Sequence, residues 1–194
     1  MNELYRAYRQ SFALLSSAEG LSFLQLVAPL LAQAELRALQ GYRHHKHTNR
    51  LHHVIRVAYL SYVLAKKKGY DEVTAARGAL LHDLFYYDDE QGDKPAHAYR
   101  THPRMALKNA ERLLPLSDAE RDIILHHMWP LTAGAPQTKE GRLVCLADKY
   151  CSLLERVHIR QRKTLSDTHQ MKGQINDRDR ETEADTKLFD HCAH

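Results

Sequence analysis

Glycine, proline and strand-like patterns are scarce in this sequence. It has eight glycines and six prolines among 194 residues, and the alternation of polar and apolar residues that is typical of half-buried strands is hard to find. No run approaches the ~18 apolar residues that a membrane span needs. The opening residues MNELYRAYRQSF also lack the apolar segment of a signal peptide. We therefore expect a cytoplasmic protein with no membrane partner and little β-sheet.

Cysteine and net charge are also low. The three cysteines, Cys145, Cys151 and Cys192, form no even-numbered disulfide framework, which indicates free thiols in a reducing compartment. A formal charge of +4 is too small for a nucleic-acid-binding surface but allows an anionic small molecule as substrate. With 43% apolar and 27% charged residues, the chain has the balance of one globular domain with a sizeable core.

Apolar residues instead recur at helical spacing through most of the chain, bounded by capping residues, glycines and prolines. The predicted helices cover residues 21–40 (ended by Gly41), 50–68 (ended by Gly69), a segment from the N-cap Asp71 to the pair His82–Asp83, a segment from the cap Thr101 or His102, with Pro103 first, to Leu114, a segment from Asp118 closed by Pro130, and residues 140–158. Residues 86–100 are polar and predict a loop.

These elements predict an all-α fold. We expect an N-terminal helical segment (1–41) packed on the core, a central domain (42–160) and a polar C-terminal tail (161–194). The tail has few apolar residues and many charges, so it is either a solvated helix or disordered.

Histidine is abundant, with fourteen residues, and several polar side chains lie on apolar helix faces. The inward-facing groups are His53, Asp83 (with its neighbour His82), His102, His127 and Asp148. Each would need its own partner if buried alone, whereas a shared metal centre would satisfy them together. Four imidazoles and two carboxylates without a thiolate suit Fe, Mn, Co, Ni or Zn. Six ligands could hold two ions, with Asp83 bridging them, as in centres that activate water against a phosphoryl group.

The same residues resemble a known family. His53, the HD pair His82–Asp83 in RGALLHDLF, and Asp148 in LADKY follow the H…HD…D order of the HD-domain superfamily of metal-dependent phosphohydrolases, over about residues 45–158. The resemblance implies an HD-domain helical bundle with a five-helix core, extended here by extra N-terminal helices. It also implies that these four residues hold the first metal ion.

Two further histidines are similar to those of HD proteins that bind two metals. THPRMALKNA resembles the HP motif of that subset and indicates His102, while ILHHMWPLT offers His126 or His127. We favour His127, which lies on the apolar face of its helix, and keep His126 as a partner or substitute. The segments HMWPL and ADKYCSLLE look like a small bacterial group of single-domain HD proteins. The residues LFYYD after the HD pair and the lack of a GYP motif disfavour a cyclic di-GMP phosphodiesterase.

Positive residues near these motifs are candidates for substrate binding. Arg56 and Lys149 each lie close in sequence to a ligand and could hold an anionic group, although surface salt bridges explain them equally well. For residues 42–50, YRHHKHTNR, a solvated polar turn is favoured over a cationic lip that attracts phosphate. Asp88 and Asp89 are candidates for a general base.

The sequence therefore predicts a metal-dependent phosphohydrolase that uses metal-activated water, with Asp83 and His82 as catalytic residues. Its expected partner is a nucleotide or another small phosphorylated metabolite, and a homodimer is compatible with the sequence. Two alternatives stay open. One is a di-iron oxygenase, because a few HD-fold enzymes use a similar six-ligand set to activate dioxygen. The other is a non-catalytic module that binds a nucleotide.

Overall fold

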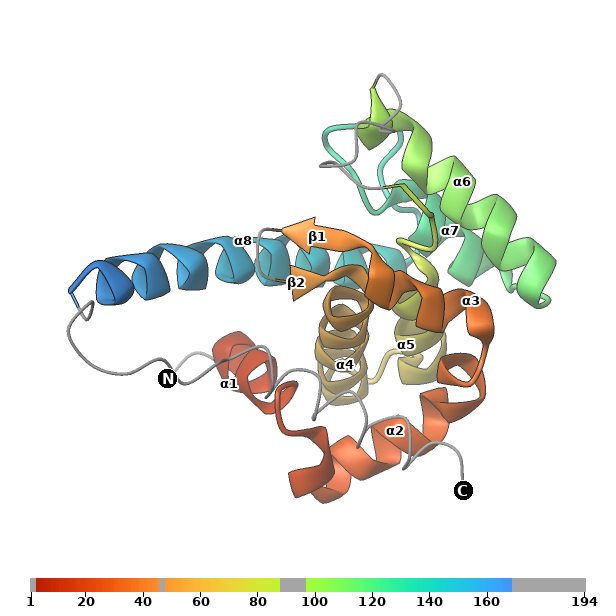
Figure 1. Ribbon diagram of the computed structural model, residues 1–194. Helices are drawn as coiled ribbons and strands as arrows, with labels where there is room; N and C mark the ends of the chain where they lie inside the picture. The colour runs from red at the N-terminus through yellow and green to blue at the C-terminus, as the bar shows by residue number, and fades with distance from the viewer. Residues whose placement is uncertain (1–2, 46–47, 88–96, 169–194) are drawn as a thin grey trace.

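Helices dominate the computed structural model, which describes residues 3–45, 48–87 and 97–168. The elements, labelled in Figure 1, are α1 (Glu3–Gln10), the 3-10 helix η1 (Leu14–Ser16), α2 (Ala18–Leu31), α3 (Ala34–Arg37), the 3-10 helix η2 (Ala38–Gly41), β1 (Arg43–His45), β2 (Thr48–Asn49), α4 (Arg50–Lys68), α5 (Glu72–Leu81), α6 (Ala98–Leu113), α7 (Asp118–His126) and α8 (Lys139–Thr168). The prediction of an all-α fold is confirmed.

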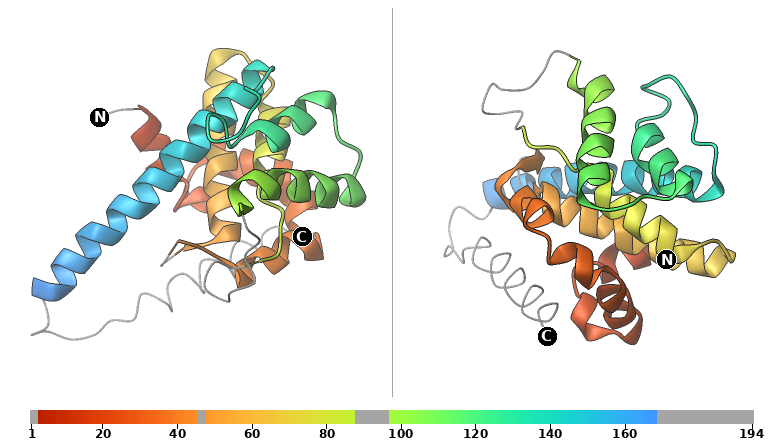
Figure 2. Two further views of the ribbon diagram at one scale, coloured as in Figure 1. Left: turned by 90° about the horizontal axis from the view of Figure 1, so that it is seen from above. Right: turned by 90° about the vertical axis from the view of Figure 1, so that its right-hand side faces the viewer.

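Helix α4 forms the centre of the bundle. Most of its side chains are buried, because it packs against α5 on one side and against α8 on another. Helices α1 and α2 cover further parts of α4, and α7 packs on α5 and α8 with α6 beside it. In two views α8 runs past the other helices, so that its C-terminal part projects from the bundle (Figures 1 and 2).

The ends of the central helices are fixed by the residues that the sequence analysis chose. Gly69 follows α4 in the left-handed conformation, with φ of 65°, which glycine adopts without steric cost. Asp71 accepts a hydrogen bond from the backbone N–H of Thr74 and so caps α5. The predicted helices over 50–68 and from Asp71 are therefore confirmed.

Two other helix predictions are wrong. The expected single helix over 21–40 is broken after Leu31, where Gln33 takes an extended conformation with ψ of 135°. The break allows Leu36 and Leu39 to be fully buried, and the guanidinium of Arg37 donates a hydrogen bond to the carbonyl of Leu31 at 3.2 Å. Tertiary burial here outweighs the helical preference of the local sequence.

The helix expected to begin at Thr101 or His102 begins instead at Ala98, immediately after His97, whose φ is 58°. Thr101, His102 and Pro103 therefore lie inside α6, and Pro103 does not occupy its first position. The side chains of Thr101 and His102 both donate to the carbonyl of Ala98, at 3.3 and 2.9 Å. These bonds strengthen the first turn, where a proline removes one main-chain hydrogen bond.

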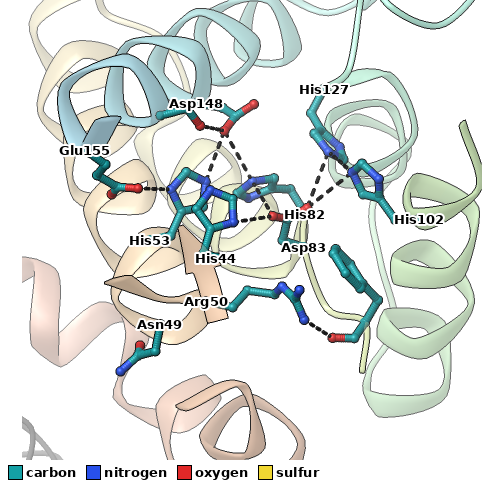
Figure 3. A network of polar contacts seen from close by, with 12 residues as sticks. His44, Asn49, Arg50, His53, His82, Asp83, His102, His127, Asp148 and Glu155 are labelled. Carbon is teal, nitrogen blue, oxygen red and sulfur yellow. Dashed lines mark hydrogen bonds and ion pairs between the residues drawn. The ribbon is translucent and has the colours of Figure 1, made fainter. Parts of the chain in front are cut away.

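A short antiparallel hairpin precedes α4, where the sequence favoured a solvated polar turn. Strands β1 and β2 pair Arg43 with Asn49, and the backbone N–H of Arg50 closes the hairpin on the carbonyl of Tyr42 at 2.8 Å. The pairing turns one histidine of the segment, His44, toward the core side of the hairpin (Figure 3).

The last helix is longer than the expected 140–158, because α8 continues to Thr168. Cys145 and Cys151 are buried free thiols, whereas Cys192 and residues 169–194 lie outside the described part of the chain. The proposed division at residues 41 and 160 stays a prediction. Among the described helices, none combines the length and the apolar character that a membrane crossing requires.

Candidate metal centre

Six predicted ligands from five segments of the chain meet in the middle of the bundle (Figure 3). None of them is more than 8% exposed. They are His53 on α4, His82 and Asp83 directly after α5, His102 on α6, His127 directly after α7, and Asp148 on α8. Side chains of this kind are expensive to bury unless they are paired or bind a metal.

Two of these histidines are oriented by their positions at the ends of helices. His82 is the C-cap of α5 and His127 is the C-cap of α7. In each, the ring Nδ1–H donates to a carbonyl of the last turn: Ala79 at 2.6 Å for His82 and Ile124 at 2.8 Å for His127. A backbone carbonyl only accepts, so the proton must lie on Nδ1, and Nε2 of a neutral ring points into the centre as a lone pair.

His102 is held in the same way, with Nδ1–H donating to the carbonyl of Ala98 at 2.9 Å. As a result, Nε2 of His102 and Nε2 of His127 face each other at 2.8 Å. Two lone pairs at this distance repel unless a proton or a cation lies between them. Nε2 of His82 and Oδ1 of Asp83 are also buried, and neither has a hydrogen-bond partner among the described residues. The donor set therefore fits a metal ion.

Asp83 lies between two groups of histidines. Its Oδ1 lies 3.4 Å from Nε2 of His102 and 3.5 Å from Nε2 of His127. Its Oδ2 lies 3.8 Å from Nε2 of His82 and 3.8 Å from Nδ1 of His44. Each carboxylate oxygen thus faces a different group, which is the arrangement of a carboxylate that can bridge two ions.

His53 joins Asp148 to a second, buried carboxylate. Its Nε2 lies 3.1 Å from Oδ1 of Asp148, and its Nδ1 lies 3.1 Å from Oε2 of Glu155. The guanidinium of Arg56 donates to the other oxygen of Glu155 at 3.3 Å. A carboxylate behind a ligating histidine is a common feature of metal sites, because it fixes the ring and raises its basicity.

The electrostatics of the centre favour a cation. Burial alone would lower the pKa of His53, but the carboxylates of Glu155 and Asp148 outweigh it and raise that pKa to about 10. Burial lowers the pKa of His82 to about 4, despite the charge of Asp83. The pKa of the Asp83 carboxyl is held well below its usual value by the surrounding histidines, although burial opposes this. A bound cation would therefore replace a proton at His53 and bind the lone pair that the neutral ring of His82 already offers.

Three groups of side chains place their ligand atoms within 4.8 Å of one another. The groups are His44 with His53 and Asp83, His53 with His82 and Asp148, and His82 with Asp83 and His127. All these ligand atoms are imidazole nitrogens and carboxylate oxygens, a set that suits first-row transition metals and zinc. Buried histidine and aspartate groups able to hold a divalent ion are thus present, with neither the identity nor the number of ions fixed by the donor set.

The structure also places the other candidates of the sequence analysis. Nδ1 of His126 contacts Oδ1 of Asp122 at 2.8 Å, whereas His127 turns into the centre. The ammonium of Lys149 donates to the carbonyl of His127 at 3.0 Å and to Sγ of Cys145 at 2.9 Å. Lys149 supports the segment that carries His127, much as Arg56 supports Glu155. A substrate-binding role for Arg56 and Lys149 stays a prediction.

A cavity of about 190 Å3 opens beside the centre. Five residues of the centre line it, namely His44, Asp83, His102, His127 and Asp148, whereas neither Arg56 nor Lys149 does. Its walls include three cationic side chains (Arg43, Arg50 and Arg156) and three aromatic rings (Phe85, Tyr87 and Tyr99). Asp88 and Asp89, the candidates for a general base, lie outside the described residues.

Two residues of the centre escaped the sequence analysis as individual candidates. Glu155 lies two turns after Asp148 on α8 and is 4% exposed, so an acidic residue on the stripe of Val144, Ala147 and Cys151 was a usable signal. His44 had no such signal, because it belongs to a polar run of similar residues. Only the pairing of β1 with β2 determines which of its neighbours faces inward.

A comparison with protein families agrees with this geometry. The family model of the HD domain matches residues 50–153, a range that contains all six predicted ligands and more than half of the chain. Searches of curated proteins and of solved structures returned no match. HD domains form a superfamily of metal-dependent phosphohydrolases, and the match leaves the substrate open. The chain belongs to the HD-domain family.

Proposed function

We propose that this HD protein is a metal-dependent phosphohydrolase that acts on a nucleotide or another small phosphate ester. One observation carries the proposal: the two oxygens of Asp83 face two separate groups of histidines, at 3.4 to 3.8 Å. His53, His82 and Asp148 would hold a first ion with Asp83, and His102 and His127 would hold a second. A pair of ions that share one carboxylate suits phosphoryl chemistry, in which the attacking and leaving oxygens both need stabilisation.

The walls of the cavity support an anionic substrate. Arg43 and Arg156 line it and offer guanidinium groups, which bind phosphate oxygens in a bidentate manner. Arg50 serves another purpose, since it donates to the carbonyls of Phe85 at 2.9 Å and Tyr87 at 3.0 Å. It thereby fixes the segment after the HD pair as one wall of the cavity.

Within this proposal, the residues of the chain bind, orient and exclude water. Bound divalent ions supply an activated water and a countercharge for the phosphoryl oxygens. The three histidines that donate Nδ1–H to the backbone keep their Nε2 lone pairs aimed at the ions. Asp83 would offer one carboxylate oxygen to each ion and His82 would bind the first ion through Nε2, which is the catalytic role proposed for this pair.

The test combines metal analysis with a phosphate-release screen. Protein purified without added metal or chelator should contain one or two Mn, Co, Ni, Zn or Fe ions per chain and should release phosphate from members of a nucleotide and phosphomonoester panel. Asp83→Ala should lose metal, and its activity should fall by more than the ~10–100-fold typical of outer-shell changes at metal sites. Asp118→Ala removes an exposed carboxylate from the first turn of α7 and should behave like the wild type.

The proposal fails if Asp83→Ala retains both its metal and its phosphate release. It also fails if the fully metallated wild type binds a nucleotide without turnover, since this result would indicate the non-catalytic module instead.

A di-iron oxygenase is the second candidate. The observation that favours it is the number of imidazoles, because His102 and His127 add two nitrogen ligands beside Asp83 and nitrogen-rich sites suit iron. Protein loaded with reduced iron would then consume O2 in the presence of an organic substrate. A metallated protein that releases phosphate and consumes no O2 would exclude this candidate.

A further inference from the structure

We propose that His44 is a seventh ligand of the centre, which binds the first ion through Nδ1 and leaves the second ion to take the substrate. The inference rests on the metal centre of the proposed function and goes beyond the six residues that the sequence motifs indicate. His44 belongs to the hairpin that precedes α4, outside the range that the HD family matches.

The position of the ring is the first argument. His44 stacks on His53 with ring centroids 3.7 Å apart and planes inclined by 21°. Its Nδ1 lies 3.8 Å from Oδ2 of Asp83, and the side chain is 15% exposed. In Figure 3 the two rings lie one in front of the other, and both reach toward the carboxylates of Asp83 and Asp148.

These separations match two ligands of one ion. Metal–nitrogen and metal–oxygen distances of about 2.1 Å place the donor atoms of neighbouring ligands about 3 Å apart and those of opposite ligands about 4.2 Å apart. Ligand atoms of His44, His53 and Asp83 lie within 4.8 Å of one another, so small side-chain movements bring all three to a single ion.

The charge around the ring is the second argument. Each of the two stacked rings faces its own carboxylate, since Nε2 of His53 is 3.1 Å from Oδ1 of Asp148 and Nδ1 of His44 is 3.8 Å from Oδ2 of Asp83. A cation between the rings and the carboxylates would satisfy all four side chains at once.

The seventh ligand would make the two ions unequal. The first ion would have five protein ligands, namely His44, His53, His82, Asp83 and Asp148. The second would have three, Asp83, His102 and His127. If each ion is a six-coordinate first-row transition metal, the first ion would keep one open coordination position and the second ion would keep three. All three ligands of the second ion, Asp83, His102 and His127, line the cavity, as do His44 and Asp148 of the first ion, whereas His53 and His82 do not. The open positions of the second ion would therefore lie toward the bound phosphate.

Nuclear magnetic resonance of the wild type provides a readout independent of activity. In protein loaded with Zn2+, the ring nitrogens of each histidine report which atom binds the metal. The histidines His82, His102 and His127 donate Nδ1–H to carbonyls and should bind through Nε2. We expect His44 to be the histidine whose Nδ1 signal shifts on addition of Zn2+.

Metal affinity provides the second readout. Competition with a chelator should show that His44→Ala binds one of its two Zn2+ ions at least ~10-fold more weakly, the lower end of the range for changes around metal ligands, while the other ion binds as before. His52→Ala is the matched control, because His52 is a half-buried histidine near the start of α4 that does not line the cavity. It should bind both ions like the wild type.

The outcomes separate this inference from the proposed function. Suppose that the wild type binds two ions, but that the Nδ1 signal of His44 does not move and His44→Ala binds both ions normally. The inference is then overturned and the six-ligand centre stands. If the wild type binds no Zn2+ at all, the proposed function fails together with the inference. The wild-type spectra decide the matter even if His44→Ala does not fold.

Discussion

Glu155 shows how much of the centre depends on a residue that touches no proposed ion. Its Oε2 accepts the Nδ1–H of His53 at 3.1 Å, and its Oε1 accepts a hydrogen bond from Arg56 at 3.3 Å. The guanidinium of Arg56 lies 4.2 Å from the ring centroid of Phe12, so the chain Phe12–Arg56–Glu155–His53 connects the N-terminal segment with the centre. Each member limits the movement of the next.

Glu155→Gln should weaken metal binding at His53. Glutamine keeps the size of the side chain but removes the charge that raises the basicity of the ring, and it leaves Arg56 without its anionic partner. We expect a loss of about 10–100-fold in affinity for one ion, the usual size of such effects, measured by competition with a chelator.

Glu35→Gln, at an exposed position on α3, provides the control for Glu155→Gln and should not change the affinity. Unaltered affinity in Glu155→Gln would show that the orientation of His53 comes from packing alone.

At the scale of elements, the N-cap Asp71 stabilises α5, the helix whose other end carries the HD pair. Asp71 accepts from Thr74 N–H at 3.0 Å and from its hydroxyl at 2.8 Å. Asp71→Ala should lower the free energy of unfolding by about 1 kcal/mol, the typical cost of losing an N-cap, in urea denaturation. Glu72→Gln, in the first turn of the same helix, should change it less.

The effect of Asp71→Ala should depend on pH in a defined direction. The backbone hydrogen bond from Thr74 lowers the pKa of Asp71 below its ordinary value of 3.8. Because the folded-state pKa is the lower one, the cap stabilises the protein above pH 3.8 and this contribution is lost as the pH falls through the folded-state pKa. Stability curves of the wild type and Asp71→Ala should therefore converge in acid, and curves that stay parallel would rule out the charged cap.

Helices α5 and α7 cross at a glycine that has no room for a side chain. A Cβ at Gly78 would lie 2.7 Å from Cδ1 and 3.1 Å from Cβ of Ile123, so the two helices would have to move apart. Gly78→Ala should destabilise the protein by about 1–3 kcal/mol, as overpacking of a core does. It should also weaken metal binding, because His82 and His127 follow these helices.

Gly41→Ala is the matched control for Gly78→Ala, because nothing lies within 4 Å of a Cβ at that position. Equal stability of the two variants in urea denaturation would show that α5 and α7 can separate without cost.

At the scale of the whole molecule, the centre connects α4, α5, α6, α7 and α8, so bound metal should stabilise the entire fold. An ion present at 100 times its dissociation constant adds about 2.7 kcal/mol to the free energy of unfolding. Thermal unfolding with Mn2+ should therefore occur at a higher temperature than unfolding with a chelator. Asp83→Ala should show the same melting temperature in both buffers, and a wild type that is equally insensitive would contradict the shared centre.

Much of this architecture is predictable from the sequence because it depends on local signals. Helix α4 is bounded by Asn49 and Gly69, and its inward face carries His53 at the spacing of its apolar residues. The break near Gln33 is not predictable in this way, because the nearest proline, Pro29, lies inside the last turn of α2 and not at the break. The burial of Leu36 and Leu39 decides where the helix stops. The position of His44 likewise depends on a strand pairing that the polar run does not encode locally.

The capping positions of His82 and His127 have a consequence for how this family can vary. One residue inserted within α5 or α7 would rotate everything beyond it by about 100° about the helix axis, and the imidazole would then point away from Asp83. An insertion in a segment between two helices would leave the direction of these two rings relative to their own helices unchanged. Natural relatives should therefore differ in length between helices while keeping constant the number of residues from Asp71 to His82 and from Ser117 to His127.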